Sequence, residues 1–63
     1  MHIEPAQIAV GDKGYYGDRD GAYVVEFVSS VGLDLRHETG EWDPIRKMSW
    51  AETEDQNWAW YRD

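Results

Sequence analysis

The fold class is indicated most clearly by Ala22-Tyr-Val-Val-Glu-Phe-Val28, in which β-branched and aromatic residues predominate. An Asp-Gly pair precedes it and a Ser-Ser pair follows it, and such polar pairs mark the ends of strands. Its side chains alternate between two faces, with Tyr23, Val25 and Phe27 expected together on one of them. A strand that is apolar on one face and mixed on the other predicts a small antiparallel sheet.

The next stretch, Val31-Gly-Leu-Asp-Leu-Arg-His37, alternates in the same way, so we expect a second strand with Leu33 and Leu35 facing inward. Glu38-Thr39-Gly40 then fits a three-residue hairpin loop whose glycine supplies the left-handed conformation. Glu41-Trp42 would begin the return strand.

Before the central strand, the segment from Gly11 to Gly21 mixes four glycines with Asp and predicts turns and an exposed loop. Residues 4–10 fit a short helix, because Pro5 stands at its first position and Gly11 follows its end. The alternation of Ile8 and Val10 leaves a strand open as the alternative.

The last third of the chain carries mixed signals. Asp43-Pro44 resembles a helix N-cap followed by proline, and Ser49-x-x-Glu52 has the spacing of a capping box. Asn57-Trp-Ala-Trp-Tyr61 has the composition of a strand. We expect a short helix or turn within 44–55 and a strand at 57–61. The predicted fold class is therefore α+β, with an antiparallel sheet of three to four strands, one or two short helices and an aromatic core.

Composition limits the classes to which this chain can belong. Its 63 residues carry 13 Asp and Glu against 6 Lys and Arg, a formal net charge of −7, and no cysteine. We expect one compact domain, 1–63, with neither a disulfide nor a thiolate zinc site. The negative charge argues against direct binding to nucleic acid or to an anionic membrane, and no apolar run is long enough for a membrane span. Because a signal-peptide pattern and cysteine are both missing, we expect a cytoplasmic protein.

No motif for catalysis, metal binding or phosphate binding is complete. His2 and His37 are expected to be ordinary surface histidines, because they match no zinc spacing. Asp18-x-Asp20-Gly21 fails as a calcium loop, since both end positions of that loop would lack a carboxylate. The spaced glycines that precede it lack the Lys-Ser/Thr ending of a phosphate-binding loop. We therefore expect no enzyme activity, no metal and no cofactor.

The acidic residues are the main functional lead, because they lie along the predicted folded elements rather than in a tail. One interpretation is a solvated surface that keeps a small domain soluble. The other is imitation of a phosphate backbone, since alternate strand residues on one face lie about 6.6 Å apart, on the scale of successive phosphates. The candidate partner-binding residues are Asp12, Asp18, Asp20, Asp34, Glu38, Glu41, Asp43, Glu52, Glu54 and Asp55.

In size and charge the whole chain resembles small phage-encoded inhibitors, particularly anti-CRISPR and anti-restriction proteins that act as DNA mimics. These proteins share no residue motif, so no functional residue is carried over to this sequence. The resemblance implies stoichiometric binding to a basic nucleic-acid-binding protein or complex in the host-cell cytoplasm, without a cofactor and without turnover.

The alternative is a small interaction or accessory subunit that docks through exposed Trp and Tyr side chains, which dominate binding hot spots. The chain has four of each, more than a core of this size readily covers. We expect at most two or three to be exposed, with Tyr15 or Tyr16 and one C-terminal aromatic the best candidates. A homodimer that buries such a patch is a third possibility.

Overall fold

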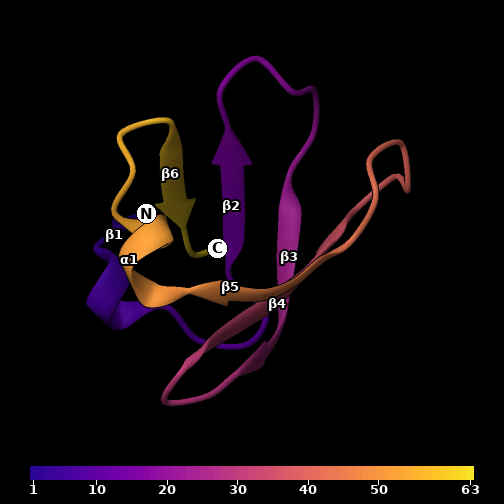
Figure 1. The fold of residues 1–63 in the computed structure, drawn as a ribbon. Coiled ribbons are helices and arrows are strands. Elements are labelled where there is room, and N and C mark those ends of the chain that lie inside the picture. The colour runs from indigo at the N-terminus through magenta and orange to yellow at the C-terminus, as the bar shows by residue number, and fades with distance from the viewer.

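The computed structural model describes all 63 residues, which form one six-stranded sheet with the order β1-β6-β2-β3-β4-β5 (Figure 1). All neighbouring strands are antiparallel. The elements in chain order are β1 (His2–Ile3), the 3₁₀ helix η1 (Pro5–Gln7), β2 (Lys13–Tyr16), β3 (Tyr23–Val28), β4 (Gly32–His37), β5 (Ile45–Ser49), α1 (Trp50–Thr53) and β6 (Trp58–Tyr61).

The predicted α+β class with three to four strands is wrong, because the sheet has six strands and α1 spans only four residues. Strands β2 to β5 form a meander, and β6 then returns to pair with β2 while β1 extends the sheet beside β6. The two strands that the sequence concealed are β1, with two residues, and β2, which lies in the glycine-rich segment predicted as a loop. None of the helices is long and apolar enough to span a lipid bilayer.

Gly14 explains why a strand passes through that glycine-rich segment. A Cβ atom at this position would lie 2.8 and 3.0 Å from two atoms of the Trp60 ring and closer still to a third. Only glycine lets the backbone of β2 approach the indole so closely. Gly14 therefore serves packing between β2 and β6, where its Cα partner is Trp60, and does not form a turn.

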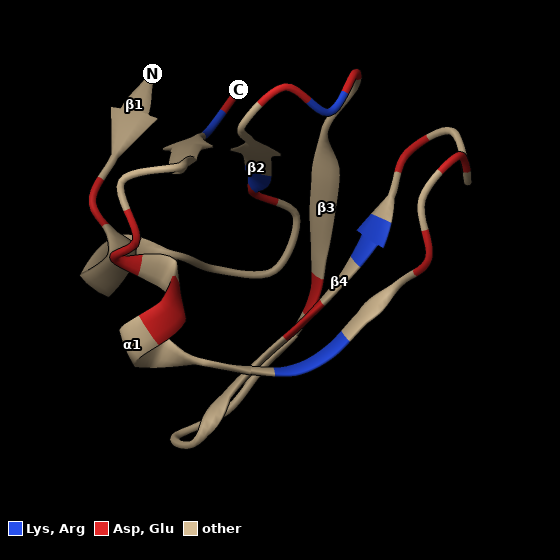
Figure 2. Ribbon diagram, turned by 45° about the horizontal axis from the view of Figure 1, so that its top comes forward, with Lys and Arg blue, Asp and Glu red and all other residues tan.

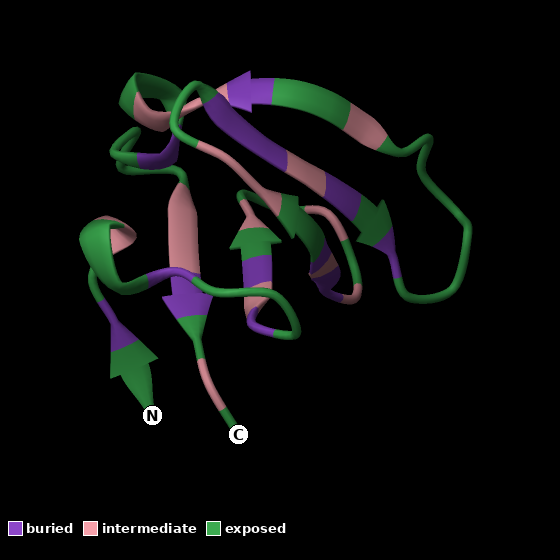
Figure 3. Ribbon diagram, turned by 90° about the horizontal axis from the view of Figure 1, so that it is seen from below, coloured by how far each residue is buried: buried purple, intermediate pink, exposed green.

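Buried positions of the core alternate with intermediate and exposed ones along the strands (Figure 3). Trp60 is the largest member of the core: the indole N–H donates to the Thr53 carbonyl at 2.9 Å, and the ring stacks on Trp58 at 4.9 Å. Thr53 comes from α1, so this hydrogen bond fastens the helix to the sheet. The core consists of Ile3, Ile8, Tyr23, Val25, Leu33, Leu35, Met48 and Trp60.

The strands expected at 22–28, 31–37 and 57–61 are present as β3, β4 and β6. The prediction that Phe27 shares the inner face with Val25 is wrong, because Val25 pairs with Leu35 whereas Phe27 pairs with Asp34. This β-bulge inserts one extra residue and turns the following side chain outward. Phe27 is 56% exposed as a result.

The expected three-residue hairpin after β4 is also wrong. β5 begins only at Ile45, so the connection runs from Glu38 to Pro44 and Trp42 lies outside the sheet. Pro44 lacks the N–H that a strand ladder requires. The predicted N-cap at Asp43-Pro44 is likewise wrong, since a strand and not a helix follows it.

The two helix signals had different outcomes. The Ser49 hydroxyl caps α1 by accepting the backbone N–H of Glu52 at 3.3 Å, which confirms that half of the expected capping box. The helix predicted within 4–10 is only the single turn of η1, which Pro5 begins. An isolated turn of this length gains too few hydrogen bonds to extend further without packing.

Candidate functional site

Three loops lie toward the same end of the sheet, along the upper side of Figure 1. The β2–β3 loop is tied to the α1–β6 turn because the Gly17 N–H donates to the Asn57 carbonyl at 2.8 Å. It is tied to the β4–β5 loop because the Ala22 N–H donates to the Glu38 carboxylate at 2.6 Å. These bonds hold loops that are distant in sequence side by side.

Seven of the ten predicted partner-binding residues belong to this end of the molecule, which we call the acidic rim. Five of them lie on the β2–β3 and β4–β5 loops. The other two, Glu52 and Asp55, border a hollow that Tyr16 and Arg19 also line. Figure 2 shows acidic segments on the β2–β3 and β4–β5 loops, and others on α1, between β1 and η1, and on β3 and β4. The acidic rim consists of Asp18, Asp20, Glu38, Glu41, Asp43, Glu52 and Asp55.

Ion pairs neutralise four of the six carboxylates outside the acidic rim, and Glu4 and Glu54 are the two that remain unpaired there. Every carboxylate that pairs with Lys or Arg lies outside the rim, the partners being Lys13–Asp63, Arg36–Glu26, Arg46–Glu26, Arg46–Asp34 and Arg62–Asp12. No rim carboxylate takes part in an ion pair with a basic nitrogen. The net negative charge of the protein is therefore concentrated on the three loops and α1.

His37 holds the rim together and is not the surface histidine that we predicted. It is 1% exposed, and its Nε2 lies 2.7 Å from the Asp20 carbonyl in the β2–β3 loop. Its Nδ1 accepts from Thr39, whose hydroxyl oxygen is 3.0 Å away. A carbonyl can only accept, so Nε2 is the donor to Asp20 while Nδ1 is the acceptor for the Thr39 N–H. The alternation of His37 with Leu33 and Leu35 is the sequence signal from which its position on the inner face could have been predicted.

Arg19 is the one basic residue within the rim, and aromatic rings surround it. Its guanidinium carbon lies 4.5 Å from the ring centre of Trp42 and 5.0 Å from that of Tyr16. One guanidinium N–H also donates to the Tyr23 hydroxyl at 2.6 Å. Arg19 thereby connects the β2–β3 and β4–β5 loops through cation–π contacts.

Asp12 lies outside the rim and has a structural role. Its carboxylate accepts hydrogen bonds from Arg62 at 2.9 Å and from the Ala9 N–H at 2.8 Å, and the residue is 4% exposed. The hydrogen bond from Arg62, assisted by that from Ala9, holds the pKa of Asp12 below its usual value although burial opposes the shift. This ion pair closes the C-terminal end of the chain onto the start of β2.

Asp34 also lies outside the rim, on the outer side of the sheet. Its carboxylate accepts the Lys47 N–H at 2.8 Å, where Lys47 adopts a left-handed φ of 56°. The β4–β5 register shifts at the same place. Asp34 therefore supports a bulge in the edge strand β5, and Arg46 neutralises part of its charge at 3.7 Å.

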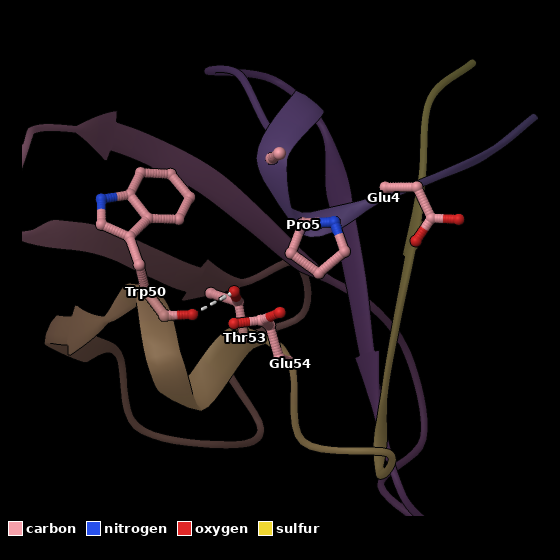
Figure 4. Close-up of a pocket in the computed structure, with 6 residues that line it drawn as sticks. Glu4, Pro5, Trp50, Thr53 and Glu54 are labelled. Carbon is pink, nitrogen blue, oxygen red and sulfur yellow. Dashed lines mark hydrogen bonds between the residues drawn. The ribbon is translucent and has the colours of Figure 1, made fainter.

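Glu54, the third residue outside the rim, borders a cleft of about 420 Å³ between η1 and α1 (Figure 4). The hydroxyl of Thr53 donates to the Trp50 carbonyl at 2.6 Å, and the Trp50 indole donates to the Ser29 carbonyl at 2.7 Å. The carboxylates of Glu4 and Glu54 also border the cleft. No nucleophile with a neighbouring base lines it.

Three of the eight Trp and Tyr side chains are exposed: Tyr15 at 41%, Trp42 at 40% and Tyr61 at 39%. This confirms the expected number and the expectation of one tyrosine from the glycine-rich segment and one C-terminal aromatic. Tyr15 and Tyr61 contact each other edge to face, with ring centres 5.6 Å apart.

No group of three His, Asp or Glu side chains is arranged to hold a metal ion. No protein-family model, no curated protein and no solved structure matches this chain.

Proposed function

We propose that the protein is a non-enzymatic inhibitor that binds a basic nucleic-acid-binding protein or complex in the cytoplasm of a host cell. In this proposal the acidic rim occupies the groove in which DNA phosphates would otherwise lie, as in phage-encoded anti-CRISPR and anti-restriction DNA mimics. The observation that carries the proposal is that none of the seven rim carboxylates has a basic partner, whereas four of the six carboxylates elsewhere do.

The hydrogen bonds among the loops favour this proposal over a merely solubilising surface. A solubilising charge works equally well on a mobile chain, but a phosphate mimic needs carboxylates at fixed positions. His37 and Glu38 fix the β2–β3 and β4–β5 loops relative to each other. A fixed array of like charges also produces a long-range field that speeds association with a basic groove.

The best test neutralises rim carboxylates that the fold does not use. The side chains of Asp18, Asp20, Glu41 and Asp43 are exposed and make no hydrogen bond or ion pair, so D18N/D20N/E41Q/D43N should fold normally. Glu38 stays unchanged because its carboxylate accepts the Ala22 N–H. A double variant outside the rim, E54Q/D63N, serves as the control.

Each protein is immobilised and exposed to nuclease-treated host lysate at low salt, and bound proteins are eluted with increasing salt. We expect the wild type and E54Q/D63N to retain a DNA-binding protein whose affinity falls at least tenfold, roughly, between 50 and 200 mM salt. The quadruple variant should not retain it, and the free wild-type protein should displace labelled duplex DNA from it. Simultaneous binding of duplex and inhibitor, or equal retention by the quadruple variant, would contradict the proposal.

The second candidate is a docking subunit that binds through aromatic side chains, and the exposed Tyr15–Tyr61 pair favours it. These rings border a shallow hollow of about 520 Å³ together with Met1 and Ala59. An interface of this kind, including one between two copies, should be far less sensitive to salt than the rim. Retention of a partner at high salt that is lost in Y15A/Y61A, but not in the rim variant, would favour this candidate.

A further inference from the structure

We infer that the hollow between β2, β5 and α1 binds one arginine or lysine side chain of the basic partner, and this inference rests on the proposed function. The hollow has a volume of about 410 Å³. That volume lies at the lower end of the range of ligand sites, so it suits a long side chain better than a folded element. We call it the aromatic hollow, lined by Tyr16, Arg19, Ile45, Met48, Glu52, Asp55 and Trp58.

Two neighbouring aromatic rings line the aromatic hollow. The rings of Tyr16 and Trp58 lie 4.8 Å apart and are inclined at 49°. Both side chains are only half-buried, so part of each ring is open to solvent. Trp58 is held in place by its stacking on the fully buried Trp60 and by its edge contact with Tyr23, whose ring centre lies 5.5 Å away. A cation or an aliphatic stem can therefore pack on a rigid surface.

Two acidic residues that line the hollow supply the complementary charge. Glu52 lies in α1, where its backbone N–H is capped by Ser49 while its carboxylate has neither a hydrogen bond nor an ion pair. The Asp55 carboxylate uses one oxygen to accept the Asn57 N–H at 2.8 Å, which leaves the other oxygen free. Two carboxylates beside aromatic rings suit a basic side chain and disfavour an anion.

Arg19 demonstrates within the same molecule that this aromatic surface accepts a guanidinium. It lies over Tyr16 at 5.0 Å and is held there by Trp42 and the Tyr23 hydroxyl, without a carboxylate partner. Glu52 and Asp55 together outweigh its single positive charge, so the site keeps a net negative charge for a second cation. The hollow beside Phe27 lacks this excess of negative charge, because Lys47 and Asp34 both line it. The Asp34 carboxylate there already accepts the Lys47 backbone N–H.

The test titrates the ¹⁵N-labelled protein with N-acetyl-arginine methylamide and follows amide and indole N–H signals by NMR. The matched probe is N-acetyl-citrulline methylamide, which has nearly the same shape but no charge, and ionic strength is held constant with NaCl. We expect the arginine probe to shift the Trp58 indole signal and signals of residues 52–58, and the citrulline probe to bind at least about fivefold more weakly.

E52Q/D55N should weaken binding of the arginine probe at least about fivefold, because it removes both charges. The amide oxygen that D55N introduces can still accept the backbone N–H of Asn57, so the turn before β6 is kept. E41Q/D43N, which neutralises rim residues away from the hollow, should leave that affinity nearly unchanged. Equal affinity for both probes, no effect of E52Q/D55N in a folded protein, or shifts centred on Tyr61 would overturn the inference.

The failure of this inference can be distinguished from the failure of the proposed function. If E52Q/D55N binds the arginine probe like the wild type while D18N/D20N/E41Q/D43N abolishes salt-sensitive retention, the aromatic hollow is not the anchor but the acidic rim still binds the partner. If the arginine probe binds as expected and retention is unaffected by the quadruple variant, the proposed function fails and the hollow is a cation site of another role.

Discussion

Replacement of Gly14 by alanine tests the contact that converts the glycine-rich segment into strand β2. The added Cβ would lie 2.8 and 3.0 Å from two atoms of the Trp60 ring, against an ordinary contact of 3.4 Å or more. The ring would have to retreat by roughly 0.6 Å or more. It is pinned by stacking on Trp58 and by its 2.9 Å hydrogen bond to the Thr53 carbonyl.

The expected cost follows from these contacts. Overpacking a tight core costs about 1–3 kcal/mol, and a weakened hydrogen bond adds about 0.5–1 kcal/mol. Alanine regains about 0.5–1 kcal/mol over glycine in a strand, because Gly14 does not require a left-handed φ. We therefore expect G14A to lower the free energy of unfolding by about 2 kcal/mol. With a urea m-value of about 1 kcal/mol/M for a small domain, the unfolding midpoint should fall by about 2 M.

The assay is urea unfolding followed by far-UV circular dichroism, combined in a double-mutant cycle with W60F. Phenylalanine lacks the outer ring atoms that the new Cβ would meet, so the cost of G14A should drop below about 0.5 kcal/mol in that background. The control is G17A, where no atom lies within 4 Å and only the φ of 50° is strained. Its cost should not depend on Trp60. A cost of G14A that persists in W60F, or is absent in the wild type, would refute the packing argument.

Three further substitutions test the other tertiary features. D12N should lose the part of the stability that depends on the ionised carboxylate of Asp12. The pKa of this carboxyl group is lower in the folded state than in the unfolded state. Its contribution to stability is therefore fully present above the unfolded-state pKa and disappears as pH falls through the folded-state pKa. Urea midpoints from pH 7 to pH 2 should therefore differ most near neutrality and converge in acid, and a constant difference would contradict the assignment. E38A should cost about 1–3 kcal/mol in thermal or urea unfolding, because it leaves a buried N–H without its acceptor, whereas E41A should change stability by less than about 0.5 kcal/mol. F27S should be similarly neutral because the bulge exposes that ring, while V25A should cost about 2 kcal/mol in the same measurement. Equal costs would contradict the outward position of Phe27.

Local signals predicted the elements whose evidence is local. The alternation of β3 and β4, the aromatic composition of β6 and the Ser49 cap all depend on residues within one element, and each is present. Strand β2 was missed because Gly14 lies in a segment with the composition of a turn, and its actual role depends on Trp60 in the last strand. The β3 bulge was missed because a shift in register is decided by the partner strand, here at Asp34.

The candidate site, too, was predicted from the sequence only in part. Composition was enough to identify carboxylates as the functional lead, and seven of the ten predicted residues lie together in the acidic rim. Sequence could not separate them from Asp12, because its partner Arg62 is 50 residues away along the chain. Nor could it reveal that Glu52 and Asp55 share a hollow with Tyr16.

Residue types alone determine the charge, the lack of cysteine and the excess of aromatic side chains, and short-range alternation predicts the central strands. None of these features requires knowledge of which distant segments meet. Three-dimensional packing, in contrast, selected which carboxylates are paired, which histidine is buried and which loops are neighbours. These depend on contacts such as that between His37 and Asp20, which form only when the meander brings the β2–β3 and β4–β5 loops to the same end of the sheet.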